Sequence, residues 1–105
     1  MISGLVAGKL YGPAELRADK AGKPFAVVKV LATSGDGETL IVNVIAFEPA
    51  ACAALQALVE GEPVALAGGI TPRVWTDKQG NVRPALDMVA HRVLSAHDAS
   101  GARLA

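Results

Sequence analysis

A single helical segment in a chain of strand-like segments is the feature that most constrains this fold. Residues 49–59, PAACAALQALV, are rich in alanine, begin with proline and are followed closely by Gly61, a pattern that predicts a helix. The other patterned segments are separated by turns that contain glycine or proline, which predicts strands, and the segment 39–47 is the clearest because it is rich in β-branched residues. We expect these strands at residues 5–10, with an extension at 14–17 after a break at 11–13, and at 25–32, 39–47, 64–75 and 82–94.

This order of elements predicts the fold. Five strands with one helix between the third and fourth strands is the order of an OB-fold, a small Greek-key barrel. At 105 residues the chain has room for one domain. We therefore predict an all-β, five-stranded OB-fold domain over residues 1–96 and a short polar C-terminal tail at 97–105. Gly68 and Gly69 in the fourth strand predict a bulge or a corner.

Strand alternation predicts apolar side chains outside the barrel as well as inside it. In the third strand one face, which we assign to the core, holds Leu40, Val42, Val44 and Ala46, and the other holds Thr39, Ile41, Asn43, Ile45 and Phe47. In the second strand the non-core face holds Phe25, Val27, Lys29 and Leu31. Because a small monomer seldom exposes so much apolar surface, we expect a ligand surface, a subunit interface or both. A homodimer or homotetramer is expected, with the first strand as a pairing edge.

Composition narrows the function classes. Ten Lys and Arg balance ten Asp and Glu, so net charge gives no support to nucleic-acid binding, and any affinity for phosphate should be modest. No apolar run reaches the roughly 20 residues that span a bilayer. The first residues lack the basic leader of a secretory signal, and the single cysteine, Cys52, is typical of a reducing cytosol. We expect a cytoplasmic protein without a membrane partner.

No catalytic or metal-binding motif is recognisable. The serines, at positions 3, 34, 95 and 100, lack a glycine elbow, and Gly68-Gly69 is not followed by the Lys-Ser of a phosphate-binding loop. His91 and His97 have no cysteine or carboxylate at metal-ligand spacing, and Cys52 should pack within the helix. We predict no enzyme activity, no cofactor and no metal.

The only tryptophan, Trp75, lies between the cations Arg73 and Lys78 in the sequence and is followed at once by a polar turn at residues 76–81. An exposed ring among cations suits stacking of a nucleobase while the cations hold phosphate. The alternative is a half-buried ring packed on the end of the barrel. Phe47 is open to the same two readings, as a stacking residue or a plug at the barrel bottom, and Tyr11 could stack or pack on its turn.

In sequence order, several short motifs resemble the bacterial single-stranded DNA-binding protein family. They are Gly8-Lys9-Leu10, Ala46-Phe47, Glu60-Gly61-Glu62-Pro63-Val64, Gly68, and Trp75-Thr76-Asp77 with Gly80 leading to Arg83. A related branch, primosomal replication protein N, shares the fold. The resemblance implies single-stranded DNA as partner, in replication, repair or recombination, with bases stacked on Trp75 and Phe47 beside the cation Arg73. The further candidate contacts are Lys78, Lys29, Lys9, Arg17, Asn43 and Arg83; solvated charge is the alternative for the cations, or an interface edge for Lys29.

The chain also departs from this family. Ile41 stands where the family often has a tryptophan, Asn43 replaces an arginine, and the loop at 34–38 lacks a stacking tryptophan. The pair Glu48-Pro49 replaces a lysine, and the family's acidic tail with an apolar tip is missing from residues 97–105. Each stacked base is worth about 1–3 kcal/mol, so we expect weaker binding and a minimal or specialised paralogue. The rival hypothesis is an OB-fold protein-interaction module of a replication complex.

Overall fold

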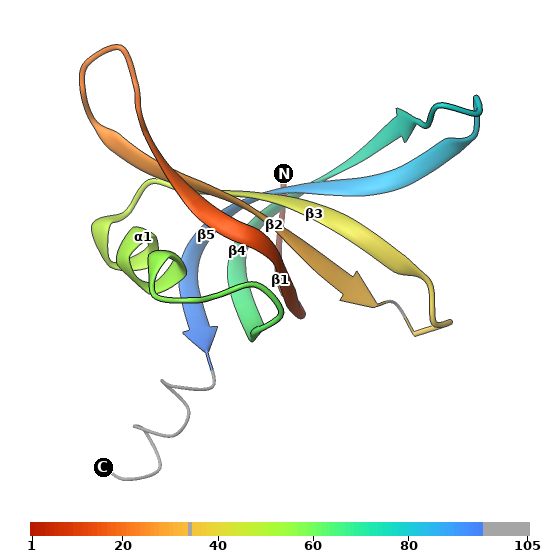
Figure 1. The fold of residues 1–105 in the computed structure, drawn as a ribbon, viewed down its shortest axis with the longest axis horizontal. Helices are drawn as coiled ribbons and strands as arrows, with labels where there is room; N and C mark the ends of the chain where they lie inside the picture. The colour runs from red at the N-terminus through yellow and green to blue at the C-terminus, as the bar shows by residue number, and fades with distance from the viewer. Residues whose placement is uncertain (34, 96–105) are drawn as a thin grey trace, which may run out of the picture.

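The computed structural model describes residues 1–33 and 35–95, in which five strands close into a barrel in the order β1-β2-β3-β5-β4 (Figure 1). The elements are β1 (Ile2–Ala18), β2 (Pro24–Thr33), β3 (Thr39–Ala46), α1 (Pro49–Gln56), β4 (Pro63–Thr76) and β5 (Val82–Ser95). A closed all-β barrel with its helix between β3 and β4 confirms the predicted OB-fold. The expected tail at 97–105, together with Ser34, His97 and Ser100, lies outside the described residues.

Strand β1 closes the barrel by pairing with two neighbours in succession. Residues Ile2 to Lys9 pair antiparallel with β4, and residues Gly8 to Ala18 pair with β2. The predicted break at 11–13 was wrong, because the strand continues through it with a shift of register between Tyr11 and Glu15. Since proline has no N–H to donate, a register shift is a position where a strand tolerates Pro13. Residues 2–7 pair with β4 alone, which leaves their other edge open.

Two glycines lie where strands come closest. A Cβ atom at Gly8, where β1 passes from β4 to β2, would overlap the carbonyl oxygen of Leu31. A Cβ atom at Gly68 would overlap the carbonyl oxygen of Val89, at the position where the β4–β5 register shifts. The bulge predicted from Gly68-Gly69 is therefore confirmed.

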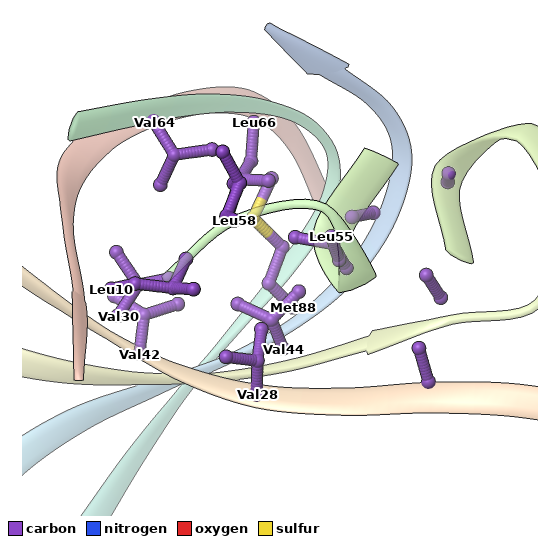
Figure 2. Close-up of a cluster of buried hydrophobic side chains, with 14 of the residues drawn as sticks. Leu10, Val28, Val30, Val42, Val44, Leu55, Leu58, Val64, Leu66 and Met88 are labelled. Carbon is purple, nitrogen blue, oxygen red and sulfur yellow. The ribbon is translucent and has the colours of Figure 1, made fainter. Parts of the chain in front are cut away.

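The core fills the barrel and is closed at one end by the helix and the turn after it. Figure 2 shows Leu55 and Leu58 directed toward the strand side chains, and the predicted core face of β3 is buried, although Leu40 at its start is only half-buried. Cys52 is buried as expected and donates its S–H to the Ala46 carbonyl (3.2 Å). The helix ends at Gln56, three residues earlier than predicted, because Leu58 turns into the core.

Two hairpins extend beyond the barrel and diverge from each other (Figure 1). One joins β1 and β2. The other joins β4 and β5, where residues 71–76 pair with residues 82–87 past the end of the β1–β4 ladder. The helix covers the opposite side of the barrel from the β4–β5 hairpin. Within the described residues, no helix is long and apolar enough to cross a membrane, and no group of three or more His, Cys, Asp or Glu side chains could hold a metal ion.

Candidate nucleic-acid interface

One row of side chains crosses the outside of the sheet on all five strands. Lys29 of β2 lies opposite Tyr11 of β1 on one side and Asn43 of β3 on the other. Asn43 is in register with Asp87 of β5, which lies opposite Thr71 of β4. We call these five residues the central row. Because neighbouring strands lie about 4.8 Å apart, the row is roughly 19 Å long.

A groove of about 810 Å³ runs over the central row. Its polar lining includes Tyr11, Glu15, Arg17, Lys29, Asn43, Arg73 and Asp87. A second hollow of about 490 Å³ shares Lys29, Asn43, Arg73 and Asp87 and extends to Trp75. The two hollows form one continuous concave surface from the β1–β2 hairpin to the β4–β5 hairpin, which we call the groove.

Trp75 lies at one end of the groove and is open to solvent. The residue is 44% exposed and stands opposite Arg83 in the β4–β5 ladder, two positions beyond Arg73 and on the same side of the strand. The predicted exposure of this ring is therefore confirmed, whereas its role in stacking a base stays a prediction. Val74, between them, alternates to the other side of the strand, although it still borders the second hollow.

The turn that follows Trp75 is organised by Asp77. Its carboxylate accepts hydrogen bonds from the backbone N–H groups of Gln79 (3.0 Å) and Asn81 (2.9 Å) and from Nε of Arg83 (3.1 Å). These contacts, chiefly the Asn81 N–H, hold the pKa of Asp77 below its usual value, because they stabilise the charged carboxylate. Arg83 is therefore engaged in its own hairpin.

Phe47 is exposed rather than buried as a barrel plug. It follows the last residue of β3, is 48% exposed, and contacts the ring of Phe25 with 6.0 Å between ring centroids. It lines neither hollow, and the strand register places it toward the opposite end of the sheet from Trp75. The structure therefore does not bring the two predicted stacking residues together, although both are accessible.

Each of the three candidate arginines is paired with a carboxylate. Nε of Arg73 donates to Asp87 at 2.7 Å, and Asn43 donates its amide hydrogen to the other carboxylate oxygen at 3.3 Å. The remaining pairs are Arg17–Glu15 (2.9 Å) and Arg83–Asp77 (3.1 Å). Lys29, by contrast, lines both hollows and makes no salt bridge within the described residues. Lys9 and Lys78 are exposed but line neither hollow.

The sequence analysis missed Asp87 and left Tyr11 open. Asp87 is 14 residues from Arg73 and 44 from Asn43 along the chain, so only strand register brings the three together. Tyr11 is exposed and lines the groove, because the long β1 carries it across from Lys29. Its position two residues after Lys9, on the same side of the strand, was the available signal.

Fold and surface together define an OB-fold barrel with an exposed aromatic and charged groove. No protein-family model matches this sequence, and no curated protein matches it. Among solved structures, the chain is similar to the crystal structure of a small single-stranded DNA-binding protein from Streptomyces coelicolor, with 20% sequence identity and a TM-score of 0.70. The match covers 90% of this chain and 93% of that one. At this identity the likeness shows the shared fold.

Proposed function

We propose that this protein binds single-stranded DNA without catalysis. The observation that carries the proposal is the half-exposed ring of Trp75 in the same groove as Lys29 and Arg73. An indole offers its face to any unpaired base, and nearby cations attract the phosphates that connect the bases. The structural likeness to a small single-stranded DNA-binding protein supports the same ligand.

The groove suits a short stretch of unpaired DNA. Trp75 and Tyr11 lie at its two ends, so bases can stack on both rings while Lys29 contacts the backbone between them. Phe47 and Phe25 offer a further aromatic surface beyond the groove. We propose contacts from the other candidates, Asn43, Arg17, Arg73, Arg83, Lys9 and Lys78, as additions to this path. Single OB-folds bind about 4–16 nucleotides, and the groove corresponds to the short end of that range.

We place this activity in the cytoplasm, in DNA replication, repair or recombination, and we propose that the protein acts as a homodimer or homotetramer. Leu5, which is 79% exposed, lies with Ala67, Ala65 and Leu94 on an apolar patch bordered by Arg92, which stands opposite Ala67; we call the four apolar residues the outer wall. The patch adjoins the open edge of residues 2–7. A second copy of the chain can pair with this edge and cover the outer wall. Both the open strand edge and the outer wall would then be shielded from solvent.

Tryptophan fluorescence tests the proposed binding directly. Titration with a mixed-sequence oligonucleotide should quench the emission of Trp75 at low salt, and the affinity should fall as salt is raised. The Trp75→Ala variant, followed by the anisotropy of a labelled oligonucleotide, should lose about 1–3 kcal/mol of binding free energy. The matched control is Val82→Ala, an exposed apolar residue of the same hairpin that lines neither hollow, which should bind like the wild type. Equal affinity in Trp75→Ala and wild type would refute stacking on this ring.

A second candidate function is a protein-interaction subunit, similar to primosomal replication protein N. The observations that favour it are the balanced net charge, the carboxylates paired with all three candidate arginines, and the outer wall. In that case the same titration would leave the tryptophan emission unchanged while the protein still bound a replication protein. Steep salt dependence with quenching would instead favour DNA as the ligand.

A further inference from the structure

The centre of the groove holds a carboxylate, which is unexpected on a surface that receives a polyanion. Asp87 of β5 stands between Asn43 of β3 and Thr71 of β4, lines both hollows, and its side chain is 41% exposed. Arg73 and Asn43 each donate to a different one of its two oxygens. A carboxylate has about four acceptor positions, so two contacts leave acceptor capacity facing the groove.

The charge of Asp87 decides which part of a DNA strand can approach it. A phosphate close to Asp87 would meet a like charge, whereas Lys29 offers an ammonium group two strands away, on the far side of Asn43. The backbone should therefore follow Lys29 and the outer part of Arg73. The base attached to it should then present its edge to Asp87 and Asn43.

Base edges differ in how well they match this arrangement. Asp87 supplies acceptors, and the remaining N–H groups of Arg73 supply donors beside it. Cytosine and adenine carry an exocyclic amino donor next to a ring acceptor, and guanine carries N–H donors next to a carbonyl. Thymine has one N–H between two carbonyl oxygens, and both oxygens would face the carboxylate. Recognition of single-stranded bases commonly uses these Watson–Crick edges, and carboxylates accept from the cytosine amino group.

We infer that Asp87, held by Arg73 and Asn43, makes the groove select bases with an exocyclic amino group over thymine. The inference rests on the proposed binding of single-stranded DNA and names the bases that this site prefers. Trp75 and Tyr11 can stack with any base, and Asp87 discriminates among the bases.

The test is a competition in which unlabelled homo-oligonucleotides of equal length displace a labelled mixed-sequence strand from the full chain. Oligo-dC should compete about tenfold better than oligo-dT, the order of discrimination given by one good pair of hydrogen bonds to a base. Oligo-dU, which keeps the thymine hydrogen-bonding pattern without the methyl group, should behave like oligo-dT. In Asp87→Asn, which preserves side-chain volume, the dC-to-dT ratio should fall to about one, chiefly through tighter binding of oligo-dT.

Glu15→Gln is the matched control, because Glu15 is another arginine-paired carboxylate that lines the same groove. This variant should tighten binding of all oligonucleotides alike and keep the wild-type ratio. A wild-type ratio near one, or a ratio that survives Asp87→Asn, overturns the inference and leaves DNA binding intact. Equal tightening for every base in Asp87→Asn also overturns it, because Asp87 would then act through charge alone. If no oligonucleotide displaces the labelled strand, or the labelled strand does not bind, the proposed function fails as well.

Discussion

At the scale of single residues, Arg73 and Lys29, two of the cations in the groove, are in very different situations. Arg73 gives its Nε to Asp87, so a phosphate must share or displace an existing partner. Lys29 projects between the half-buried Val27 and Leu31 and makes no salt bridge within residues 1–33 and 35–95. Its ammonium group is therefore the one best placed to contribute phosphate contact without a competing carboxylate.

Lys29→Ala should weaken binding of all DNA sequences by a similar factor. Because one phosphate contact is lost, the slope of log K against log salt should become shallower by about 0.7. Anisotropy titrations at several salt concentrations measure this change. Lys20→Ala, in the exposed turn between β1 and β2, is the control and should leave the slope nearly unchanged. Equal changes in the two variants would mean that Lys29 acts only through the overall electrostatic field of the protein and not through a phosphate contact.

The residues of the groove were predictable from sequence to different degrees. Trp75 could be predicted as exposed because a polar turn follows it directly, which is local information. The pairing of Asp87 with Arg73 and Asn43 could not, because it depends on the antiparallel β4–β5 and parallel β3–β5 registers. Phe47 could be placed at the end of its strand, but whether it pointed into the barrel depended on how the chain turns into α1.

At the scale of secondary-structure elements, the strand order and the helix position were predictable from alternation and turn residues. The continuity of β1 was not, because Gly12-Pro13 has the local pattern of a break, and only the pairing with β2 shows that the register can shift there. Tertiary packing also explains why α1 ends earlier than the sequence predicted. Leu58 packs into the core, and Gly61 then donates its N–H to the Leu10 carbonyl (2.8 Å).

The bulge in β4 gives a prediction about stability. In Gly68→Ala the new methyl group would overlap the Val89 carbonyl, so the two strands must separate locally, and we expect a loss of about 1–3 kcal/mol in the free energy of unfolding. Gly35→Ala is the control, since a Cβ there meets nothing within 4 Å. Urea unfolding measures both variants. The same midpoint in Gly68→Ala and Gly35→Ala would show that the bulge accommodates a side chain.

The β4–β5 hairpin gives a prediction about pH. The pKa of Asp77 is lowered in the folded hairpin, so its contribution to hairpin order is present above the ordinary carboxyl pKa of about 4 and is lost as pH falls through the lowered value. Acid titration of the Trp75 fluorescence anisotropy should show the ring becoming more mobile below about pH 4. In Asp77→Ala the ring should be mobile throughout, without this transition.

The matched control for this pH effect is Asp36→Ala, because Asp36 caps another turn by accepting the Glu38 N–H at 3.2 Å. That turn is remote in sequence from the hairpin that carries Trp75. The Asp36→Ala variant should therefore keep the wild-type titration of Trp75. An acid transition of equal size in wild type and Asp77→Ala would show that other carboxylates order the hairpin.

At the scale of the whole molecule, the balanced charge and the exposed apolar outer wall both favour an oligomer. Zero net charge and carboxylates paired with the groove arginines predict a modest affinity for each site. Joining two sites through an oligomer raises the affinity for a long strand, because binding of the second site becomes intramolecular. The outer wall and the open edge of residues 2–7 lie on β1, β4 and β5, and none of the outer-wall residues lines the groove. An interface there would leave the groove free.

Leu5→Lys should separate oligomerisation from binding. Light scattering should give two or four times the chain mass of 10.7 kDa for the wild type and the mass of one chain for the variant, because a charge replaces an apolar interface residue. The variant should bind a short oligonucleotide like the wild type but lose roughly 100-fold or more in affinity for a strand long enough to reach two sites. Val59→Lys, an equally drastic change at an exposed apolar residue after α1, should keep the wild-type mass. If the wild type is a monomer, the outer wall is not a subunit interface, and one groove alone must account for the affinity for long strands.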